Sequence, residues 1–393
     1  MLGRVRDAGL YGHQLLFYGF WGVLVAVFLV CFHSIFFQKS ESSKNILRIY
    51  SWAYYVPDSV LRAFEKQEGV RVVYDVFDST ETLEAKLLAA RSGYDVVFAS
   101  SFPTAALFVP AGVFAPLDMR QLSNRRYLDP EIMARLRGVD RTGQFLLPYL
   151  WGTTGLIYHK DKLRDIEEKN PGITFPRDSW QLLFNADYAQ KLTQCHMVIL
   201  DSPADVFPDI LLSLGLHPNT LNLNYLKVSA LVLAAIKPFI YRFSSDVLQE
   251  LLAQNICVGQ VFSTYANMAI RGLKERYGAS PYAYVLPKEG AQLWVDVVAI
   301  PKDAGNKKLA HRFLNYLMSP SVIAAVTNQA YAANAVPASK KWVRKDIRDD
   351  ETIYPSPSTR RRLYTDRLPS RAFQRLRLRY WTSIKGGVLK TDG

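Results

Sequence analysis

The carboxylates of Asp205 and Asp296 are groups that can do acid–base chemistry when they are paired. The six histidines are scattered along the chain, and the sequence has no HExxH, no Gly-x-Ser-x-Gly elbow and no Walker phosphate loop. Without a recognisable set of partner residues, the two carboxylates do not indicate an active site. We therefore predict that the protein is not an enzyme and that it has no catalytic residue, metal ligand or cofactor.

The first stretch after residue 45 alternates between strand-like and helix-like patterns. Runs rich in apolar and β-branched residues predict strands, and runs with apolar residues on one side predict helices. The strands are expected at 47–50, 70–77 and 95–99, and the helices at 58–68 and 80–91. This alternation is typical of a parallel α/β sheet. Ligands of such sheets bind at the carboxyl ends of strands, so residues 51–55 and 99–101 are the first places to look for a site.

Length and charge limit the class of protein. A chain of 393 residues is too long for one small core and suits two lobes. Its formal net charge of +13 would suit nucleic acid or an anionic membrane surface as a partner. The sequence has no helix-turn-helix, zinc-finger or RNA-recognition signature, so we expect no nucleic-acid partner.

The N-terminus predicts a membrane segment. Arg4 and Arg6 precede an apolar run at 15–37 that is about as long as a membrane span. A small-x-small cleavage pattern is hard to find before Lys39, and Cys31 lacks the small preceding residue that lipoprotein processing requires. We predict an uncleaved signal anchor, with 1–14 cytoplasmic, 15–37 transmembrane, 38–45 as a linker and the rest exported. A cleaved signal peptide is the alternative.

Several motifs of the part after residue 45 resemble one family, in order and at matching spacings. They are IYSWAYYVP, VYDVFDSTETLEAKLLA, GYDVVFASSF, PYLWGTTGLIY, NICVG, PKEGAQLWVDVVAIP and FLNYLMSP. The chain that carries them resembles the bacterial periplasmic polyamine-binding proteins of ABC transporters, above all the putrescine receptors, within the type II periplasmic solute-binding family. The resemblance implies a monomeric periplasmic receptor, here tethered to the inner membrane by its anchor, that delivers a small amine ligand to an ABC transporter permease.

The resemblance also implies an α/β, two-lobed periplasmic-binding-protein fold with a hinge between the lobes, here preceded by the predicted transmembrane helix. Lobe 1 would comprise 46–151 and 295–335, and lobe 2 would comprise 152–294 and 336–393. The first crossover between the lobes would contain Gly152 and Gly155, which flank two threonines. These glycines suit either a hinge that absorbs backbone rotation or an ordinary tight connection.

The resemblance assigns the ligand site residue by residue. A polyamine needs carboxylates for its ammonium groups and flat aromatic walls for its methylene chain. Side chains of these kinds stand at five matching positions, which are Trp52, Tyr55, Asp205, Trp294 and Asp296. Other matching positions have changed in type: Tyr54 and Tyr265 stand where the family has acids, and Phe262 stands where it has a tryptophan. Ala99 stands where it has a serine and Ala332 where it has a tyrosine.

Each of the two lost carboxylates would have made a charge-assisted hydrogen bond worth about 1.5–3 kcal/mol. Losing both lowers the affinity for a diamine by roughly 10²–10⁴-fold. We expect a solute-binding protein that captures a polyamine or related amine-containing ligand between two lobes for ABC-type import. The alternative is a membrane-tethered receptor-like protein with altered ligand specificity that acts as a sensor or envelope adaptor. An open acidic cleft favours the first function, and a cleft plugged by Tyr54 and Tyr265 favours the second.

Two of the three cysteines lie in the part that we expect to be exported. Cys195 and Cys257 match a cysteine pair of the putrescine receptors, so the resemblance implies a disulfide between them. An oxidising periplasm would favour that bond. Two buried thiols are the alternative.

The C-terminal residues 340–393 carry most of the charge. They hold 15 Lys and Arg against 6 Asp and Glu, which gives +9 of the chain's +13. That excess suits either a solvated helix face or a contact with anionic lipid headgroups.

Overall fold

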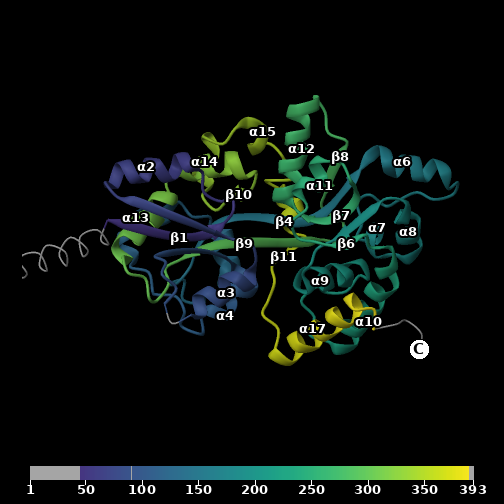
Figure 1. The fold of residues 1–393 in the computed structure, drawn as a ribbon, viewed down its shortest axis with the longest axis horizontal. Coiled ribbons are helices and arrows are strands. Elements are labelled where there is room, and N and C mark those ends of the chain that lie inside the picture. Colours follow the sequence, from purple (N-terminus) through teal and green to yellow (C-terminus); the bar gives the residue numbers. More distant parts are fainter. Residues whose placement is uncertain (1–44, 90, 389–393) are drawn as a thin grey trace, which may run out of the picture.

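The computed structural model describes residues 45–89 and 91–388, and a mixed sheet runs along the length of this part (Figure 1). The order of its strands is β2-β1-β3-β9-β4-β7-β5-β6, with β8 and β10 paired to β4 and β11 paired to β9. The strands are β1 (Ile46–Trp52), β2 (Arg71–Phe77), β3 (Val96–Ser100), β4 (Leu147–His159), β5 (His196–Ile199), β6 (Arg242–Phe243), β7 (Ile256–Phe262), β8 (Tyr282–Val285), β9 (Ala291–Ala299), β10 (Ala333–Asn334) and β11 (Leu363–Tyr364).

Helices cover both faces of this sheet (Figure 1). They are α2 (Asp58–Glu68), α3 (Thr80–Leu88), α4 (Ala106–Phe108), α5 (Pro130–Leu136), α6 (Lys160–Lys169), α7 (Gln181–Phe184), α8 (Ala186–Lys191), α9 (Pro203–Ser213), α10 (Leu223–Ile236), α11 (Leu248–Leu252), α12 (Ser263–Tyr277), α13 (Lys307–Leu317), α14 (Pro320–Ala330), α15 (Lys345–Arg348), α16 (Pro357–Arg360) and α17 (Arg371–Lys385).

The first three strands are parallel, as the sequence predicts. β1 pairs in parallel with β2 on one side and with β3 on the other. α2 covers them with three buried side chains, Val60, Leu61 and Phe64, and it ends at Gly69, whose φ of 65° only glycine adopts without strain. α3 ends at Leu88, three residues earlier than the predicted helix at 80–91.

Two long strands, β4 and β9, pass from one half of the molecule to the other (Figure 1). β9 pairs with β3 at Asp296 to Ala299 and with β4 along most of its length, and all of these pairs are antiparallel. β4 pairs with β7 and β8 from Thr154 onward. The shared strands therefore join two lobes, each with its own strands and helices, in a two-lobed α/β architecture.

The two glycines of the first crossover are required by close packing within β4. A Cβ atom on Gly152 would overlap the Trp294 indole, and one on Gly155 would lie 2.7 Å from the Tyr284 hydroxyl. Both glycines lie in a strand whose thirteen residues are all buried. Close packing therefore requires glycine at both positions, whether or not the backbone also rotates there.

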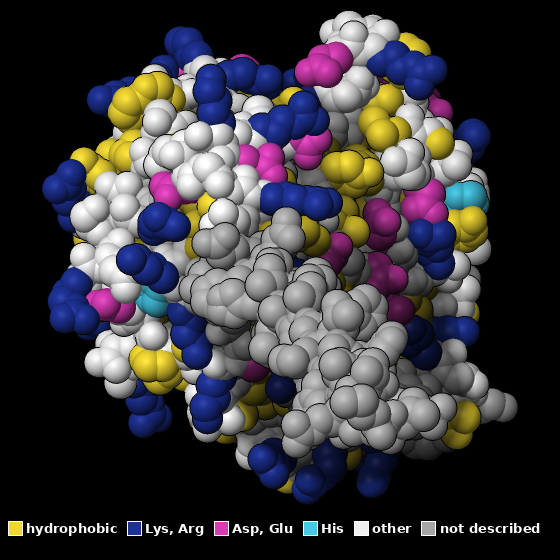
Figure 2. All heavy atoms as spheres, turned by 60° about the vertical axis from the view of Figure 1, so that its left-hand side comes forward, with side chains coloured by type: hydrophobic (Ala, Val, Ile, Leu, Met, Phe, Trp, Pro, Cys, Tyr) yellow, Lys and Arg dark blue, Asp and Glu magenta, His cyan; other side chains and the backbone are white. Residues whose placement is uncertain are grey.

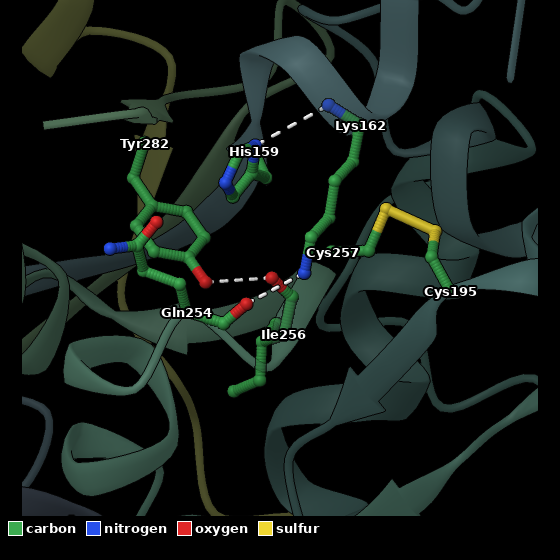
Figure 3. The surroundings of a disulfide bond; sticks show 7 residues. All are labelled: His159, Lys162, Cys195, Gln254, Ile256, Cys257 and Tyr282. Atoms are coloured by element: carbon green, nitrogen blue, oxygen red, sulfur yellow. Dashed lines mark hydrogen bonds between the residues drawn. A yellow bond between two sulfur atoms is a disulfide. The ribbon is translucent and has the colours of Figure 1, made fainter. Parts of the chain in front are cut away.

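The structure joins Cys195 and Cys257 by a disulfide, with their Cα atoms 5.4 Å apart (Figure 3). Cys195 directly precedes β5 and Cys257 lies in β7, its parallel neighbour. In the same region, the Tyr282 hydroxyl donates to the Ile256 carbonyl oxygen at 2.7 Å, and Lys162 Nζ donates to the Gln254 carbonyl oxygen at 2.6 Å. These contacts attach β7 to β8, and they attach the residues just before β7 to α6.

The predicted anchor at 15–37, the cytoplasmic stretch 1–14 and nearly all of the predicted linker lie outside the described residues. Within 45–89 and 91–388, none of the helices has the length and apolar character that a membrane crossing requires.

Candidate functional site

A buried carboxylate, Asp296, lies at the centre of the candidate site. It lies on β9 directly opposite Ser100, the last residue of β3, and only 6 % of its surface is exposed. The Tyr55 hydroxyl donates a hydrogen bond to Asp296 Oδ2. Burial raises the pKa of Asp296 to about 7, and the bond from Tyr55 opposes part of this rise. The carboxyl can therefore gain or lose a proton near neutral pH.

The turn after β1 separates two neighbouring tyrosines. Tyr54 has a φ of 62°, in the left-handed region, and its side chain is 72 % exposed. Tyr55 turns inward, where the Tyr149 hydroxyl donates to its carbonyl oxygen at 2.7 Å and fixes the turn. The structure therefore brings Tyr55 to Asp296 and leaves Tyr54 at the surface.

Tyr265 comes close to Tyr55 from the far end of β7. It lies in the first turn of α12, which starts directly after β7. Burial raises the pKa of Tyr55 well above its ordinary value, and the charges of Asp296 and of the Tyr265 phenol act in the same direction. Tyr55 from one lobe and Tyr265 from the other are thus electrostatic neighbours.

Trp294 and Phe262 form an aromatic corner two residues along β9 from Asp296. Their ring centroids are 6.4 Å apart with the planes at 87°, an edge-to-face contact. Trp294 Nε1 is buried and, like the hydroxyl of Ser100, finds no hydrogen-bond partner in the described part of the chain. A ligand or water that accepts from the indole and contacts Ser100 would satisfy both groups.

Trp52 ends β1 and packs against the next strand. Its ring centroid lies 4.3 Å from that of Phe77, and its carbonyl oxygen accepts from the Tyr74 hydroxyl at 3.1 Å. The ring is half-buried. These contacts hold Trp52 at the carboxyl end of β1 but do not join it directly to the group around Asp296.

Asp205 belongs to a second polar cluster, at the start of α9. Burial raises its pKa, and hydrogen bonds from Ser202 and Gln292 and the charge of Arg377 oppose the rise. Gln292 donates to Asp366 and accepts from Thr154 Oγ1 at 2.6 Å. Burial, with the nearby Asp205 charge, raises the pKa of Asp366 to about 7.

The same cluster contains a second carboxylate of α9. Gln260 Nε2 donates to Asp209 Oδ2 at 2.6 Å, and the Tyr364 hydroxyl lies 3.3 Å from Asp209 Oδ1. Burial raises the pKa of Asp209 well above its ordinary value. Sequence reasoning missed Asp209, although it lies four residues after Asp205 on one side of a helix, a spacing that is readable from the sequence.

β9 connects the two groups. Gln292, Trp294 and Asp296 alternate along this strand, so their side chains lie on one face of it. Gln292 and Asp296 are about 13 Å apart along the strand at roughly 3.3 Å per residue. One face of a strand shared by both lobes thus carries an acid, an aromatic wall and an amide. Within the described residues no three His, Cys, Asp or Glu side chains are arranged to hold a metal ion.

Comparisons with known proteins agree with this architecture. Residues 59–353 match the family described as bacterial extracellular solute-binding protein, and the chain belongs to that family. It is 39 % identical over 352 residues to the putrescine-binding periplasmic protein SpuD of Pseudomonas aeruginosa, an alignment covering 89 % of this chain and 94 % of that one. It is 36 % identical over 349 residues to the putrescine-binding periplasmic protein PotF of Escherichia coli, covering 88 % and 93 %.

Solved structures show the same fold. A putative spermidine/putrescine ABC transporter protein from Listeria monocytogenes superposes with a TM-score of 0.74 at 28 % identity, covering 87 % of this chain and 99 % of that one. The family consists of binding proteins for transported solutes, so the predictions of a two-lobed solute receptor and of a non-enzymatic role are confirmed.

Proposed function

We propose that this protein captures an amine-containing solute between its two lobes and delivers it to the permease of an ABC importer. The names of its relatives describe proteins that bind putrescine, or spermidine and putrescine. The observation that carries the proposal is Asp296, a buried carboxylate that has no basic partner in the described part of the chain. Burying an unpaired carboxylate is costly, and a ligand ammonium group would offset that cost.

In this proposal each site residue has a defined role. Asp296 holds the cationic end of the ligand, and Asp205 faces its other end. Flat walls for the methylene chain come from Trp52, Tyr55, Phe262, Tyr265 and Trp294. Tyr54, which is exposed next to Tyr55, would contact the ligand from the surface. Lobe 1 would comprise 46–151 and 295–335, and lobe 2 the remainder after residue 151.

The proposal extends to the setting of the protein. The receptor would act as a monomer in the periplasm, where a disulfide between Cys195 and Cys257 is stable. The segment 15–37 would tether it to the inner membrane. The second candidate is a tethered receptor-like protein that binds another ligand instead of amines and acts as a sensor or envelope adaptor. Tyr265 in place of a family acid favours it, because one charge that would hold an amine is missing.

Thermal shift of the full chain in a mild detergent tests the proposal. Putrescine, spermidine, agmatine and monoamines are compared with neutral and anionic controls at pH 8. A ligand at a hundred times its Kd should stabilise the protein by about 2.7 kcal/mol. The shift should vanish in Asp296→Asn and persist in Asp165→Asn, an exposed carboxylate on α6. If no amine stabilises the folded protein, the proposed amine binding is refuted and the second candidate function is favoured.

A further inference from the structure

Helices α10 and α17 lie side by side on α9 and form one outer surface of the second lobe (Figure 1). Asn219, just before α10, donates from Nδ2 to the Thr365 carbonyl oxygen at 3.0 Å, which ties the approaches of the two helices together. On the inner side of α17, Trp381 meets Phe207 of α9 with ring centroids 6.4 Å apart. The fold therefore fixes which side of each helix points outward. We call this surface the α10–α17 face.

The α10–α17 face exposes an unusual amount of apolar surface. Of the fifteen large hydrophobic residues that are exposed in the described part of the chain, eight lie on these two helices or the segments leading into them. They are Leu214, Leu221, Leu223, Tyr225, Val228, Leu231, Leu368 and Leu378. Several exposed apolar residues that share neighbouring elements mark an interaction surface more often than scattered single ones do.

Arginines stand beside these apolar residues. Arg371, Arg375 and Arg379 recur every fourth residue along α17, and all three are exposed. None of them makes an ion pair with an acid in the described residues, and neither helix contains Asp or Glu. Figure 2 shows Lys and Arg side chains along the edges of the molecule, its lower edge included.

We propose that the α10–α17 face rests on an anionic phospholipid surface. Guanidinium groups bind phosphate through paired hydrogen bonds, and neighbouring leucine and valine side chains can enter the boundary between headgroups and acyl chains. Two helices without Asp or Glu, which expose arginines and apolar side chains, complement a layer of phosphates over hydrocarbon, although Asp201 pairs with Lys385 near the end of α17. Three arginines near such a surface account for about a hundredfold in lipid affinity.

Site-specific photo-crosslinking of the full chain, reconstituted into vesicles, tests this contact. Benzoylphenylalanine is placed at Leu231 or Leu378, and at Val76 of the other lobe as a control whose exposure matches that of Leu378 and exceeds that of Leu231. Vesicles contain phosphatidylcholine alone or with one third phosphatidylglycerol. Lipid adducts should form at Leu231 and Leu378, at least tenfold more with phosphatidylglycerol, and remain near background at Val76.

Charge-reversal variants distinguish lipid contact through the α10–α17 face from any other attachment of the chain to the membrane. Replacing three arginines of α17 by glutamate should reduce the lipid adducts at least tenfold, whereas replacing three exposed arginines of the other lobe should not. The α17 set is Arg371, Arg375 and Arg379. The control set in the other lobe is Arg91, Arg125 and Arg141. Should the α17 variant fail to fold, 0.5 M salt applied to the otherwise unchanged protein must lower the adducts instead.

Three outcomes would overturn the inference: equal lipid adducts at Val76 and Leu231, adducts that do not depend on phosphatidylglycerol, or adducts mainly to a second copy of the chain. Each is independent of ligand binding, because the α10–α17 face shares no residue with the proposed amine site. A failed amine shift and a failed lipid contact are therefore separate results.

Discussion

Replacing Asp296 by asparagine should stabilise the ligand-free protein, and more strongly at alkaline pH. Burial raises the pKa of this carboxyl from 3.8 to about 7 in the folded chain. In the unfolded chain it returns to about 3.9. The folded state therefore holds the proton more tightly, so the cost of the buried charge is absent below about pH 4, grows as the pH rises toward 7 and is constant above it.

The size of the effect follows from the pKa shift. About three pKa units at 1.36 kcal/mol each amount to about 4 kcal/mol of unfolding free energy at pH 8. At pH 5, about one unit above the unfolded pKa, the cost is only about 1.5 kcal/mol. Asparagine cannot ionise, yet its oxygen can still accept the hydrogen bond from Tyr55. The gain on Asp296→Asn should thus rise from about 1.5 to about 4 kcal/mol between pH 5 and pH 8.

Urea unfolding of the full chain in a non-ionic detergent, followed by tryptophan fluorescence at both pH values, measures this gain. Asp165→Asn, on the exposed side of α6, serves as the control and should change little at either pH. A gain of equal size at pH 5 and pH 8 would refute the reasoning, as would a variant less stable than the wild type at pH 8. The same variant should lose amine binding, because the group that holds the cation is gone.

Three other variants test separate parts of the structure. Gly152→Ala should lower stability by about 1–3 kcal/mol in thermal melts, because its Cβ would overlap the Trp294 indole. Tyr265→Asp should tighten putrescine binding about tenfold or more by calorimetry, since it adds a charge-assisted bond. Replacing Cys195 and Cys257 by alanine should cost roughly 2–4 kcal/mol, and thiol titration of the unfolded wild type should find one free thiol before reduction and three after.

Local patterns predicted the elements that hold the site. The helix predicted at 58–68 has the bounds of α2, and the strand predicted at 47–50 lies inside β1. Both follow from residue period and type, which are properties of a few neighbouring residues. The rule that ligands bind at the carboxyl ends of parallel strands also pointed to residues 51–55, where Tyr55 meets Asp296.

The direction of single backbone turns and the contacts between distant residues could not be predicted from the sequence. Tyr54 and Tyr55 are neighbours of one residue type, and only the φ of 62° at Tyr54 decides which ring turns inward. Asp366 reaches Gln292 from 74 positions further along the chain. Their meeting depends on the path of the C-terminal segment over lobe 2, which no periodic pattern encodes.

The two ends of the proposed site differ in charge, and this difference bears on the ligand. Near Asp205 the chain supplies its own cation, Arg377, whose pKa is lowered by burial and held up by Asp366 and Asp205. A second ligand ammonium there would meet that guanidinium, whereas Asp296 has no such partner in the described residues. A ligand with one cationic end and a neutral polar end therefore fits best. N-acetylputrescine should bind at least as tightly as putrescine in calorimetric titrations, and a tenfold preference for the diamine would contradict this argument.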